Sequence, residues 1–210
     1  PPPRLKGLTV KYIECGAPQQ WSVQTVYHVF IGIGSNLGRQ QAHILRALDA
    51  LTRTPQIRLI ALSPWYRNPP IGLKHQGHHI NGVIEIHTPL TPLALLHTLK
   101  RIERQIGRTQ KRKRWGPRVI DLDILLYETR TLRTRALHLP HAQIWKRAFT
   151  VLPLLDLYER LPAPTQQRLL HAAQHFTRDA FQRIAFPDPR RRSWRHGVPL
   201  HTPARHQHAE

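Results

Sequence analysis

The sequence predicts an α+β fold, a ferredoxin-like α/β sandwich with a central, mainly antiparallel sheet. Two observations predict it. Apolar segments with strand character and apolar segments with helical spacing follow one another in the order β-α-β-β-α-β. No helix separates the second strand from the third, so these two strands are expected to pair as antiparallel neighbours. The chain of 210 residues is long enough for one such domain with a full core and additional tails.

Four strands are predicted where β-branched and aromatic residues are dense. They span 27–33, 57–66, 79–88 and 119–127. The first runs into the turn sequence GSNLG. The second runs into RNPPIG (67–72), which is expected to be a loop because its two prolines lack N–H donors. The third strand shows a slip in its apolar alternation near Gly82, which indicates a bulge.

The helices are predicted from apolar residues at steps of three and four. The first two span 39–52 and about 92–106, and Gly107 is a natural stop for the second. Further elements are expected after the last of the four strands. They are a short strand and then two helices, within 132–141, 144–157 and 166–183.

The composition is that of a globular chain with a large excess of positive charge. Hydrophobic residues make up 40% and charged residues 21%, while the net charge is +20. A strongly basic chain usually binds something anionic: nucleic acid, an acidic membrane or a polyphosphate. The charge is concentrated between Lys100 and Arg118, where nine basic residues accompany a single acid, Glu103. Because Trp, Gly and Pro interrupt this stretch, it favours a binding site over a solvated tail.

The composition also excludes several classes of protein. The single Cys15 excludes an internal disulfide framework and a multi-cysteine zinc site, so a reducing cytoplasm is the expected compartment. No apolar run approaches the roughly 20 residues that a membrane helix needs. The first residues, PPPRLKGLTV, do not have the apolar core of a signal peptide.

Asp121 and Asp123 predict a metal site. Residues i and i+2 of a strand point to the same face, so the two carboxylates are expected to lie side by side. Two like charges this close are unfavourable unless a cation binds between them. Mg²⁺ typically binds one or two carboxylates and completes its shell with water and substrate phosphates. The alternative is a pair of exposed strand carboxylates held by nearby arginines.

The basic loop before these aspartates predicts a polyphosphate ligand. Its cations are Arg108, Lys111, Arg112, Lys113, Arg114 and Arg118. Such a loop repels itself unless an anion gathers it. A nucleoside triphosphate supplies that anion, because arginine binds phosphate oxygens bidentately and stabilises the charge that develops on them. A loop that closes over the substrate also excludes water. The alternative is a solvated run of charges.

Two weaker features predict contacts with a heterocycle and with phosphate. A slot lined by aromatic rings and amides would suit a planar heterocycle, although core packing of the same aromatics is the simpler interpretation. Its residues would be Trp65, Asn68, Pro69, Pro70, Asn81, Trp115 and Phe149. His141 follows Pro140, and Arg147 lies six residues further on, so both are candidates for phosphate contacts.

Together these motifs resemble the 6-hydroxymethyl-7,8-dihydropterin pyrophosphokinase family, HPPK. The matching segments are IGIGSNLG, WYRNPPIG, INGVIEI, RIERQIGR, RWGPRVIDLDILLY, LPH and RAFTVLPLLDL, in this order. The similarity covers about 28–186, which is therefore the expected catalytic domain. Residues 1–27 are left as an N-terminal extension and 187–210 as a basic, disordered tail. The family's ferredoxin-like fold agrees with the element order above.

The resemblance implies a reaction and its ligands. The pterin hydroxymethyl oxygen attacks the β-phosphorus of ATP, the pyrophosphoryl group moves as one unit, and AMP leaves, in folate biosynthesis. Two Mg²⁺ ions bridge the aspartates and the triphosphate. ATP and a pterin alcohol are the expected partners, nucleic acid and membrane are not expected, and the protein is expected to be a monomer.

The resemblance also implies roles for individual residues. The catalytic set is Arg108, Arg118, Asp121 and Asp123, of which the two aspartates bind the metal and Asp121 also orients or deprotonates the hydroxymethyl group. The residues expected at ATP are Glu103, Arg108, Lys111, Arg114, Arg118, Ile124, His138, His141 and Arg147. The residues expected at the pterin are Asn68, Pro69, Pro70, Ile71, His79, Asn81, Trp115 and Phe149.

The sequence departs from the family pattern at several positions. His79 stands where an aromatic residue, often Tyr, is expected beside the pterin asparagine, and Gln110 where a basic residue often helps the loop to hold phosphate. The other departures are Lys100, His138 and Ala142. They leave open an inactive homologue, and the positive charge leaves open a ferredoxin-like RNA-binding protein. RNA binding, however, gives no reason for adjacent aspartates, and the chain lacks an aromatic-rich strand of the RNP type.

Overall fold

The computed structural model describes residues 25–69, 77–108 and 117–186, together with the backbone of 194–195 and 198–199. Within these residues the main sheet has the order β5-β1-β4-β3-β8, and β2 also pairs with β4. All its pairings are antiparallel. Its strands are β1 (Tyr27–Ser35), β2 (Arg58–Leu62), β3 (Trp65–Asn68), β4 (His79–Thr88), β5 (Asp121–Tyr127) and β8 (Gln182–Ile184). The order β5-β1-β4-β2 confirms the predicted ferredoxin-like topology.

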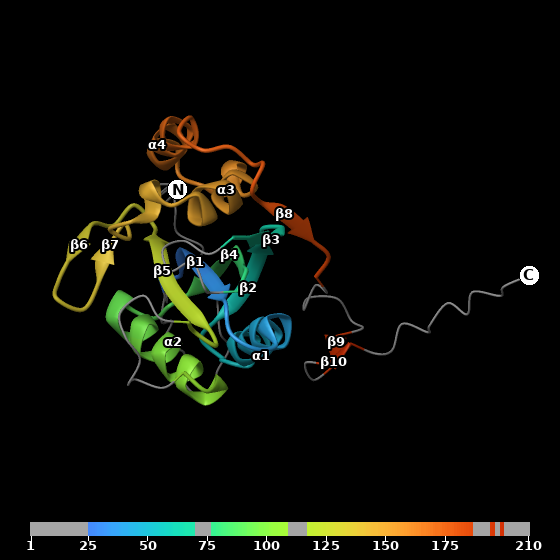
Figure 1. Cartoon of the computed structure of the whole chain (residues 1–210). Helices are drawn as coiled ribbons and strands as arrows, with labels where there is room; N and C mark the ends of the chain where they lie inside the picture. Colours follow the sequence, from blue (N-terminus) through green and yellow to red (C-terminus); the bar gives the residue numbers. More distant parts are fainter. Residues whose placement is uncertain (1–24, 70–76, 109–116, 187–193, 196–197, 200–210) are drawn as a thin grey trace, which may run out of the picture.

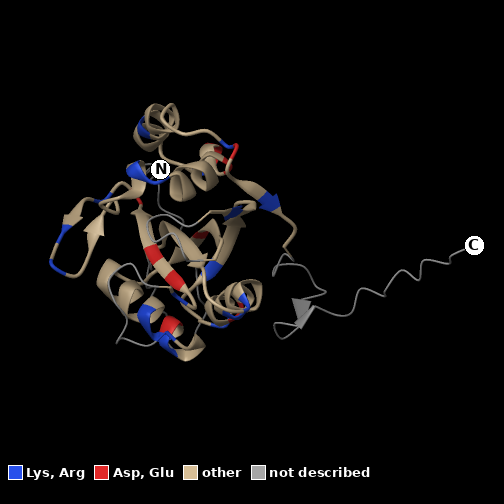
Figure 2. Ribbon diagram, in the orientation of Figure 1, with Lys and Arg blue, Asp and Glu red and all other residues tan. Residues whose placement is uncertain are grey.

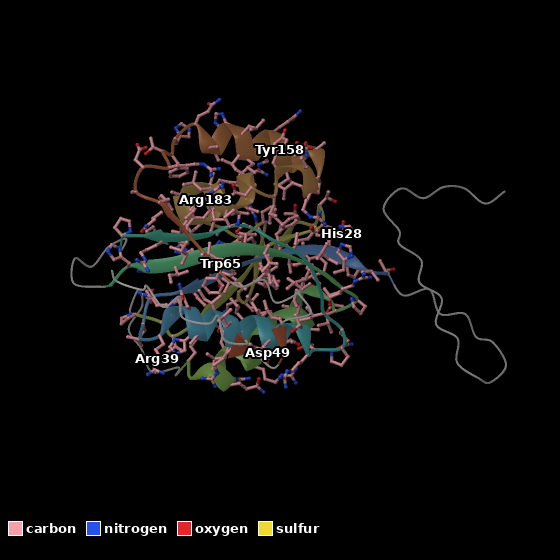
Figure 3. All side chains as sticks on the ribbon, turned by 90° about the vertical axis from the view of Figure 1, so that its right-hand side faces the viewer. His28, Arg39, Asp49, Trp65, Tyr158 and Arg183 are labelled. Carbon is pink, nitrogen blue, oxygen red and sulfur yellow. The ribbon has the colours of Figure 1, made fainter. Side chains whose placement is uncertain are left out.

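Helices cover both faces of this sheet (Figure 1). Two helices lie on each face, α1 with α2 and α3 with α4. Their bounds are Gln40–Thr52, Pro92–Ile106, Ala148–Leu155 and Ala163–Ala173, respectively. The short 3-10 helices η1 (Ile144–Lys146) and η2 (Tyr158–Arg160) flank α3. Figure 3 shows the three layers from the side, with Asp49 of α1, Trp65 of the sheet and Tyr158 in successive layers.

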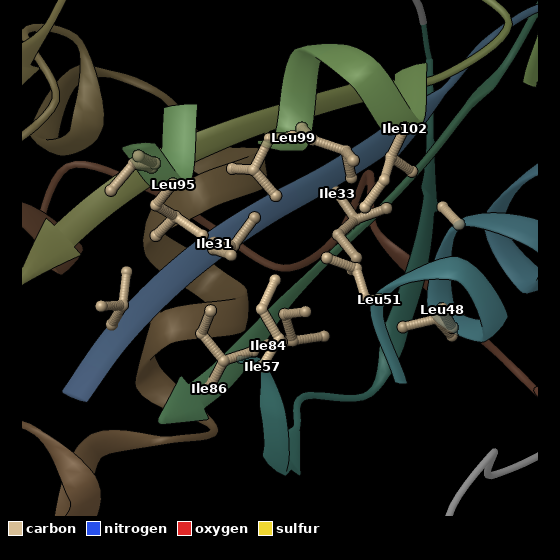
Figure 4. Close-up of a cluster of buried hydrophobic side chains, with 14 of the residues drawn as sticks. Ile31, Ile33, Leu48, Leu51, Ile57, Ile84, Ile86, Leu95, Leu99 and Ile102 are labelled. Carbon is tan, nitrogen blue, oxygen red and sulfur yellow. The ribbon is translucent and has the colours of Figure 1, made fainter. Parts of the chain in front are cut away.

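Alternation along the strands builds two apolar cores, because successive strand residues face opposite sides. Ile31 and Ile33 of β1 pack against α1 and α2 in the larger core (Figure 4). Phe30, which directly precedes Ile31, packs with Val151 and Leu154 of α3 on the opposite face. The sheet is therefore buried on both sides along its middle.

Helix α2 begins and ends where the sequence predicts. The Thr91 side chain accepts a hydrogen bond from the Ala94 N–H at 3.4 Å, and Pro92 takes the first helical position. Gly107 ends the helix with a φ of 112°, a left-handed conformation that favours glycine. This end fixes where the chain leaves toward the basic loop.

The single strand predicted at 57–66 is wrong, because the structure divides it into β2 and β3. The division falls at Ser63 and Pro64, and proline has no N–H to donate to a ladder. The Ser63 hydroxyl instead accepts the Val83 N–H at 2.9 Å, and the Ser63 N–H donates to the Val83 carbonyl at 2.8 Å. β3 then continues to Asn68, so the first two residues of the predicted loop 67–72 belong to a strand.

The bulge predicted near Gly82 is also wrong. The β1–β4 register is continuous through the pair Ile33 and Gly82. A Cβ on Gly82 would lie 2.7 Å from the Trp65 ring, so this glycine makes room for an aromatic side chain instead. The register shift on β1 lies between Phe30 and Ile31, facing β5.

The helix predicted at 166–183 is correct only in its first part. α4 ends at Ala173, and 182–184 forms β8, which pairs with β3. Side-chain contacts hold this segment against the sheet. Arg183 Nη2 lies 2.7 Å from Asp156 Oδ1, and Arg178 Nη1 donates to the Tyr66 hydroxyl at 2.9 Å. Local periodicity cannot detect such distant partners.

The remaining short elements refine the predictions near the C-terminus. The strand expected within 132–141 is a small hairpin of β6 (Leu132–Arg133) and β7 (His138–Leu139). The helix expected at 144–157 is divided into η1 and α3 at Arg147, whose backbone is extended. Two further paired strands, β9 (Trp194–Arg195) and β10 (Val198–Pro199), lie within the predicted tail. The rest of 187–210, and most of 1–27, lies outside the described residues.

Candidate active site

The sequence-predicted carboxylates and the pterin asparagine lie in one row across the sheet. Gly34 of β1 pairs with Asp121 of β5 on one side and with Asn81 of β4 on the other. Gly32 pairs with Asp123 of β5 on one side and with Val83 of β4 on the other. Directly opposed residues in an antiparallel ladder share a face, so the glycines leave that face of β1 without side chains between the acids and the amide. Glycine inside a strand often marks the close approach of a ligand.

The face that carries these residues is the one covered farther along by α3 and α4. Val83, which pairs with Gly32, packs in the α3–α4 core. Leu122, between the two aspartates, packs in the opposite core, as the sequence predicts. The acidic positions stand out in Figure 2 as red bands on β5. Asp121 and Asp123 therefore share one strand face at the edge of the sheet.

Asp121 is held by two arginines. Arg108 Nη1 donates to its Oδ1 at 2.6 Å, and Arg118 Nη1 contacts its Oδ2. Burial by itself raises the pKa of Asp121, but Arg118, Arg108 and Lys100 outweigh burial and hold the pKa below its ordinary value. The arginine-held alternative considered for this pair thus describes Asp121 in this structure.

Asp123 is the more available of the two carboxylates. Its side chain is 37% exposed, and its Oδ1 lies 3.7 Å from Lys100 Nζ. Lys100 stands at a position where the sequence departs from the family pattern. The contact makes this departure part of the electrostatics of the carboxylate pair.

Glu103 has a structural role that sequence reasoning missed. It is 1% exposed and lies beside β5, which is an edge strand. Its Oε1 accepts from the Leu122 N–H at 2.7 Å and lies 2.5 Å from Arg108 Nη1. Lys100 Nζ also donates to it at 2.9 Å. Burial raises the pKa of Glu103, although these neighbours oppose the effect.

Glu103 therefore satisfies an edge N–H of β5 and at the same time directs Arg108 toward Asp121. A signal for this role was present in the sequence, because Glu103 is the single acid in the basic stretch between Lys100 and Arg118.

Asn36 is a second residue that sequence reasoning missed. Its Oδ1 accepts from the Arg118 N–H at 2.6 Å, and its own N–H donates to the Arg118 carbonyl at 3.1 Å. Its Nδ2 lies 3.1 Å from His79 Nε2. The neighbouring Ser35 hydroxyl donates to the Val119 carbonyl at 2.6 Å. The turn after β1 thereby fixes the start of β5 and joins the acidic side of the site to the pterin side.

Three of the residues expected at the pterin are brought together at the ends of β3 and β4. Asn81 Nδ2 donates to Asn68 Oδ1 at 2.7 Å, and both side chains are buried. His79 pairs with Asn68 in the β3–β4 ladder, and burial lowers its pKa. A Cβ on Gly34 would lie 2.5 Å from Asn81 Oδ1, so the amide fits against β1 only because Gly34 is a glycine.

Other predicted residues divide between the site and the core. Trp65 packs in the core against Phe186, as in the simpler interpretation of the aromatic slot. Ile124 is 2% exposed and packs in the α1–α2 core, away from the face of the aspartates. Pro69 and His138 are exposed, at the end of β3 and in β7. Part of the predicted set lies outside the described residues: Pro70, Ile71, Gln110, Lys111, Arg112, Lys113, Arg114 and Trp115.

His141 and Arg147 lie over the carboxylates from the α3 side. The His141 N–H donates to the Leu125 carbonyl at 2.9 Å, which ties this residue to β5. Burial lowers the pKa of His141, Asp123 and Asp121 raise it, and Arg147 lowers it further. The Arg147 guanidinium lies 5.5 Å from the centre of the half-buried Phe149 ring. Ala142, the last of the departures, is exposed beside them.

Comparison with known proteins identifies the family. Residues 30–159 match 7,8-dihydro-6-hydroxymethylpterin-pyrophosphokinase (HPPK). The chain belongs to the HPPK family. A 2-amino-4-hydroxy-6-hydroxymethyldihydropteridine pyrophosphokinase of Pseudomonas aeruginosa is 42% identical over 144 residues, 69% of this chain and 88% of the relative. The protein of the same name from Aquifex aeolicus is 38% identical over 142 residues, 68% and 87% of the two chains.

Solved HPPK-containing structures share the fold. A crystal structure of Plasmodium falciparum HPPK-DHPS has a TM-score of 0.55 at 13% identity and covers 77% of this chain. A structure of HPPK-DHPS in complex with substrates has a TM-score of 0.53 at 14% identity and covers 75%. This HPPK chain spans about half the length of those two chains, 49% and 48%. The likeness concerns the fold and agrees with the predicted sandwich.

In the part of the HPPK chain that the structure describes, no helix is long and apolar enough to cross a membrane. The cytoplasmic location and the monomeric state expected from the sequence stay predictions.

Proposed function

We infer that this chain transfers the pyrophosphoryl group of ATP to 6-hydroxymethyl-7,8-dihydropterin, a step of folate biosynthesis. The family match and the activity named for its relatives support this function. The observation that carries it is the row formed by Asp121, Gly34 and Asn81, with Arg108 and Arg118 at its acidic end. This row offers an acidic and arginine-rich part for phosphate beside an amide-rich part for a heterocycle.

The reaction forms one bond and breaks one. The pterin hydroxymethyl oxygen forms a bond to the β-phosphorus, and the bond from that phosphorus to the α–β bridging oxygen breaks. AMP leaves with the bonding electron pair, and the hydroxyl proton passes to a base. We propose that Asp121 orients this hydroxyl, because it lies in the same row as the pterin amide.

We propose that Asp121 and Asp123 bind Mg²⁺, with two ions accompanying ATP. Carboxylate oxygens on one rigid strand face are the hard ligands that Mg²⁺ prefers, and Asp123 is exposed enough to take it. Asp121 fits once Arg108 and Arg118 turn to the phosphates. When bound, the metal neutralises triphosphate charge and favours displacement at the β-phosphorus.

We propose that Arg108, Arg118 and Arg147 bind the triphosphate together with His141. His141 Nδ1 accepts the Gln143 N–H at 3.2 Å, so the proton of the neutral ring is assigned to Nε2. A neutral donor near Asp123 can bind a phosphate oxygen without first repelling the metal. Glu103 acts from behind Arg108, as a positioning residue.

The remaining assignments follow the resemblance. Asn81, Asn68 and His79 would bind the edge of the pterin, and Phe149 would lie along its ring, with Trp115, Pro69, Pro70 and Ile71 completing that wall. Lys111, Arg114 and His138 are assigned to the nucleotide, and Ile124, whose side chain packs in the α1–α2 core, is assigned to it only through its backbone. Each of these assignments is a proposal.

The RNA-binding alternative is disfavoured by the cover on the sheet. RNA-binding domains of this topology stack bases on an open sheet face. Here α1 and α2 cover one face, and α3 and α4 cover the other (Figure 1).

The test of the function is a coupled product assay. ATP, Mg²⁺ and 6-hydroxymethyl-7,8-dihydropterin should yield AMP equal in amount to the pterin consumed. Formation of ADP, or the lack of pterin-dependent AMP, would contradict the proposal. Failure of the folded chain to bind either substrate would instead indicate an inactive homologue.

Asp123→Asn should lower turnover by about 10²–10³-fold or more, the usual loss for a main charge-stabilising group. Its melting temperature should change little, since the side chain is partly exposed. Asp179→Asn, an exposed acid of the segment between α4 and β8, is the matched control and should keep full activity. Undiminished turnover in Asp123→Asn would exclude the metal-ligand role.

A further inference from the structure

A second group of metal-ligating side chains lies on the same sheet face, away from the aspartates. Within the described residues, His28, Glu85 and His87 form a cluster that could hold a metal ion. His28 of β1 and His87 of β4 are directly opposed in the ladder, and Glu85 lies two residues before His87 on the same face. The strand register thus places two imidazoles and one carboxylate together.

The distances suit a small tetrahedral ion. Glu85 Oε1 lies 3.6 Å from His28 Nδ1 and 3.5 Å from His87 Nε2. One ligand atom from each residue lies within 4.8 Å of the others. Two atoms that each lie about 2.1 Å from a tetrahedral Zn²⁺ are about 3.4 Å apart. The two distances to Glu85 Oε1 are therefore close to this ideal, and the two imidazoles would complete the site by a small rotation that brings their ligand atoms to the same separation.

The cluster has a ligand atom with unmet bonding capacity. Among the described residues, the buried His87 Nε2 has no hydrogen-bond partner. Glu85 is 2% exposed, and Arg160 Nε contacts its Oε2, which leaves Oε1 facing the two imidazoles. The His28 side chain is 40% exposed, so solvent reaches the cluster and can supply a fourth ligand.

The cluster is separate from the carboxylate site. His28 stands four residues before Gly32, the partner of Asp123, which corresponds to about 13 Å along an extended strand. In Figure 3, His28 and Arg39 appear at opposite sides of the molecule. Because β1 runs from His28 toward the turn before Arg39, the cluster lies at the end of β1 opposite to that turn.

We propose that His28, Glu85 and His87 bind one divalent transition-metal ion of the Zn²⁺ type, with water as the fourth ligand. Imidazole nitrogens favour Zn²⁺ and its neighbours over Mg²⁺ or Ca²⁺, which prefer all-oxygen shells. Arg160 stays on Oε2 as an outer contact that orients the carboxylate. Burial lowers the pKa of His87, and Arg58, which pairs with His87 from β2 and is exposed to solvent, helps to lower it further and so favours the neutral imidazole that a metal requires. The ion would join β1 to β4 at this end of the sheet.

The test is zinc titration of the full 210-residue chain after removal of metal with a chelator. Excess Mg²⁺ in the buffer occupies the carboxylate site without competing for imidazole. Calorimetry gives stoichiometry and affinity, and Co²⁺ absorption reports tetrahedral coordination by nitrogen. We expect His28→Gln to weaken the site by more than about 100-fold, since even outer-shell changes cost 10–100-fold.

His28→Gln is the preferred variant, because its side chain is partly exposed and can be replaced without unfolding the protein. His87→Gln is the second variant to be tested. The matched controls, His97→Gln and His171→Gln, replace exposed histidines of α2 and α4 and should keep the site. Zinc should also raise the melting temperature of the wild type and leave that of His28→Gln unchanged. Equal zinc affinity in wild type and His28→Gln, or no zinc binding by the wild type, would overturn the proposal.

Discussion

Gly34 shows how a missing side chain shapes this site. A Cβ there would lie 2.5 Å from Asn81 Oδ1, a distance that Cβ atoms do not adopt. Asn81 is therefore free to lie against β1 and to bond Asn68 at 2.7 Å. At the residue scale, the part of the site that we propose for the pterin depends on the missing Cβ of Gly34 as much as on the two amides.

Gly34→Ala should raise the pterin KM by about 10–100-fold, the effect of displacing one buried polar group, which costs about 1–3 kcal/mol. The ATP KM should change little, because Asn81 lies on the pterin side. Steady-state kinetics with each substrate varied in turn measures both values. An unchanged pterin KM would separate Gly34 from recognition.

A double-mutant cycle supplies the control for this prediction. If Gly34→Ala acts through the Asn81 amide, it should add little to the loss already caused by Asn81→Ala. Full additivity of the two losses would mean that the new methyl group acts on the ligand directly.

Residues whose role follows from a local sequence motif could be predicted from the sequence. Asp121 and Asp123 share a face because strand spacing alone requires it, and the structure places them so. The roles of Glu103 and Asn36 were missed: the sequence marks Glu103 as the single acid of its basic stretch, but it does not show which groups either side chain contacts. Glu103 bonds an edge N–H of β5, and Asn36 holds Arg118, more than 80 residues away in sequence. Such contacts depend on strand order, which a motif does not contain.

At the scale of elements, side chains of α2 hydrogen-bond to the backbone of β5. β5 is an edge strand, and edge strands leave unpaired N–H and C=O groups. Here Glu103 accepts the Leu122 N–H, and Lys100 donates to the Leu122 carbonyl at 3.2 Å. The helix thereby closes the edge at the residue between the two aspartates.

Glu103→Ala should lower the free energy of unfolding by about 2–4 kcal/mol, because the Leu122 N–H loses its acceptor and Arg108 loses one of its two carboxylate partners. Glu103→Gln should cost less, since an amide oxygen still accepts from Leu122. Arg104→Ala, on the exposed side of the same helix, should stay within about 0.5 kcal/mol. Urea denaturation measures all three, and a neutral Glu103→Ala would contradict the edge role.

Elements with a strong local pattern were predicted well, and elements set by distant partners were not. α2 carries both its cap and its stop in the sequence, at Thr91 and Gly107. The division at Ser63 and the strand β8 are different. Each is held by groups elsewhere, the Val83 backbone in the first case and Asp156 in the second.

At the scale of the whole molecule, partly buried histidines link stability to pH. Burial lowers the pKa of His79, His87 and His141 from the ordinary value of 6.5. The unfolded chain then binds more protons than the folded chain as pH falls through about 6.5, so acidification destabilises the fold. Glu103, whose pKa burial raises, acts with the opposite sign.

The free energy of unfolding should therefore fall between pH 7.5 and 6, and His79→Gln should fall less steeply than the wild type. His97→Gln, which removes an exposed histidine, should keep the wild-type slope. Denaturation at both pH values gives the slopes. Identical slopes in wild type and His79→Gln would show that this ring does not contribute.

The order of elements was enough to predict the global topology, because a β-α-β-β-α-β chain has few ways to bury its apolar faces. The helices α3 and α4 were predicted as helical segments, but the sequence did not indicate which face of the sheet they cover. Its place follows from Phe30, Val83 and Leu125, which give the far face of the sheet its own apolar surface.

The two arginines mean that Asp121 already has cationic partners, whereas Asp123 is more exposed. If Asp121 binds the metal as we propose, a metal ion that arrives alone must displace guanidinium groups that then have no anion to bind, and a triphosphate that arrives alone leaves a bare carboxylate behind. The metal–nucleotide complex carries positive charge on the metal and negative charge on the phosphates. Each displaced arginine and carboxylate therefore finds a new partner of opposite charge. On this proposal, binding is an exchange of ion-pair partners, and the site favours metal and nucleotide together over either one alone.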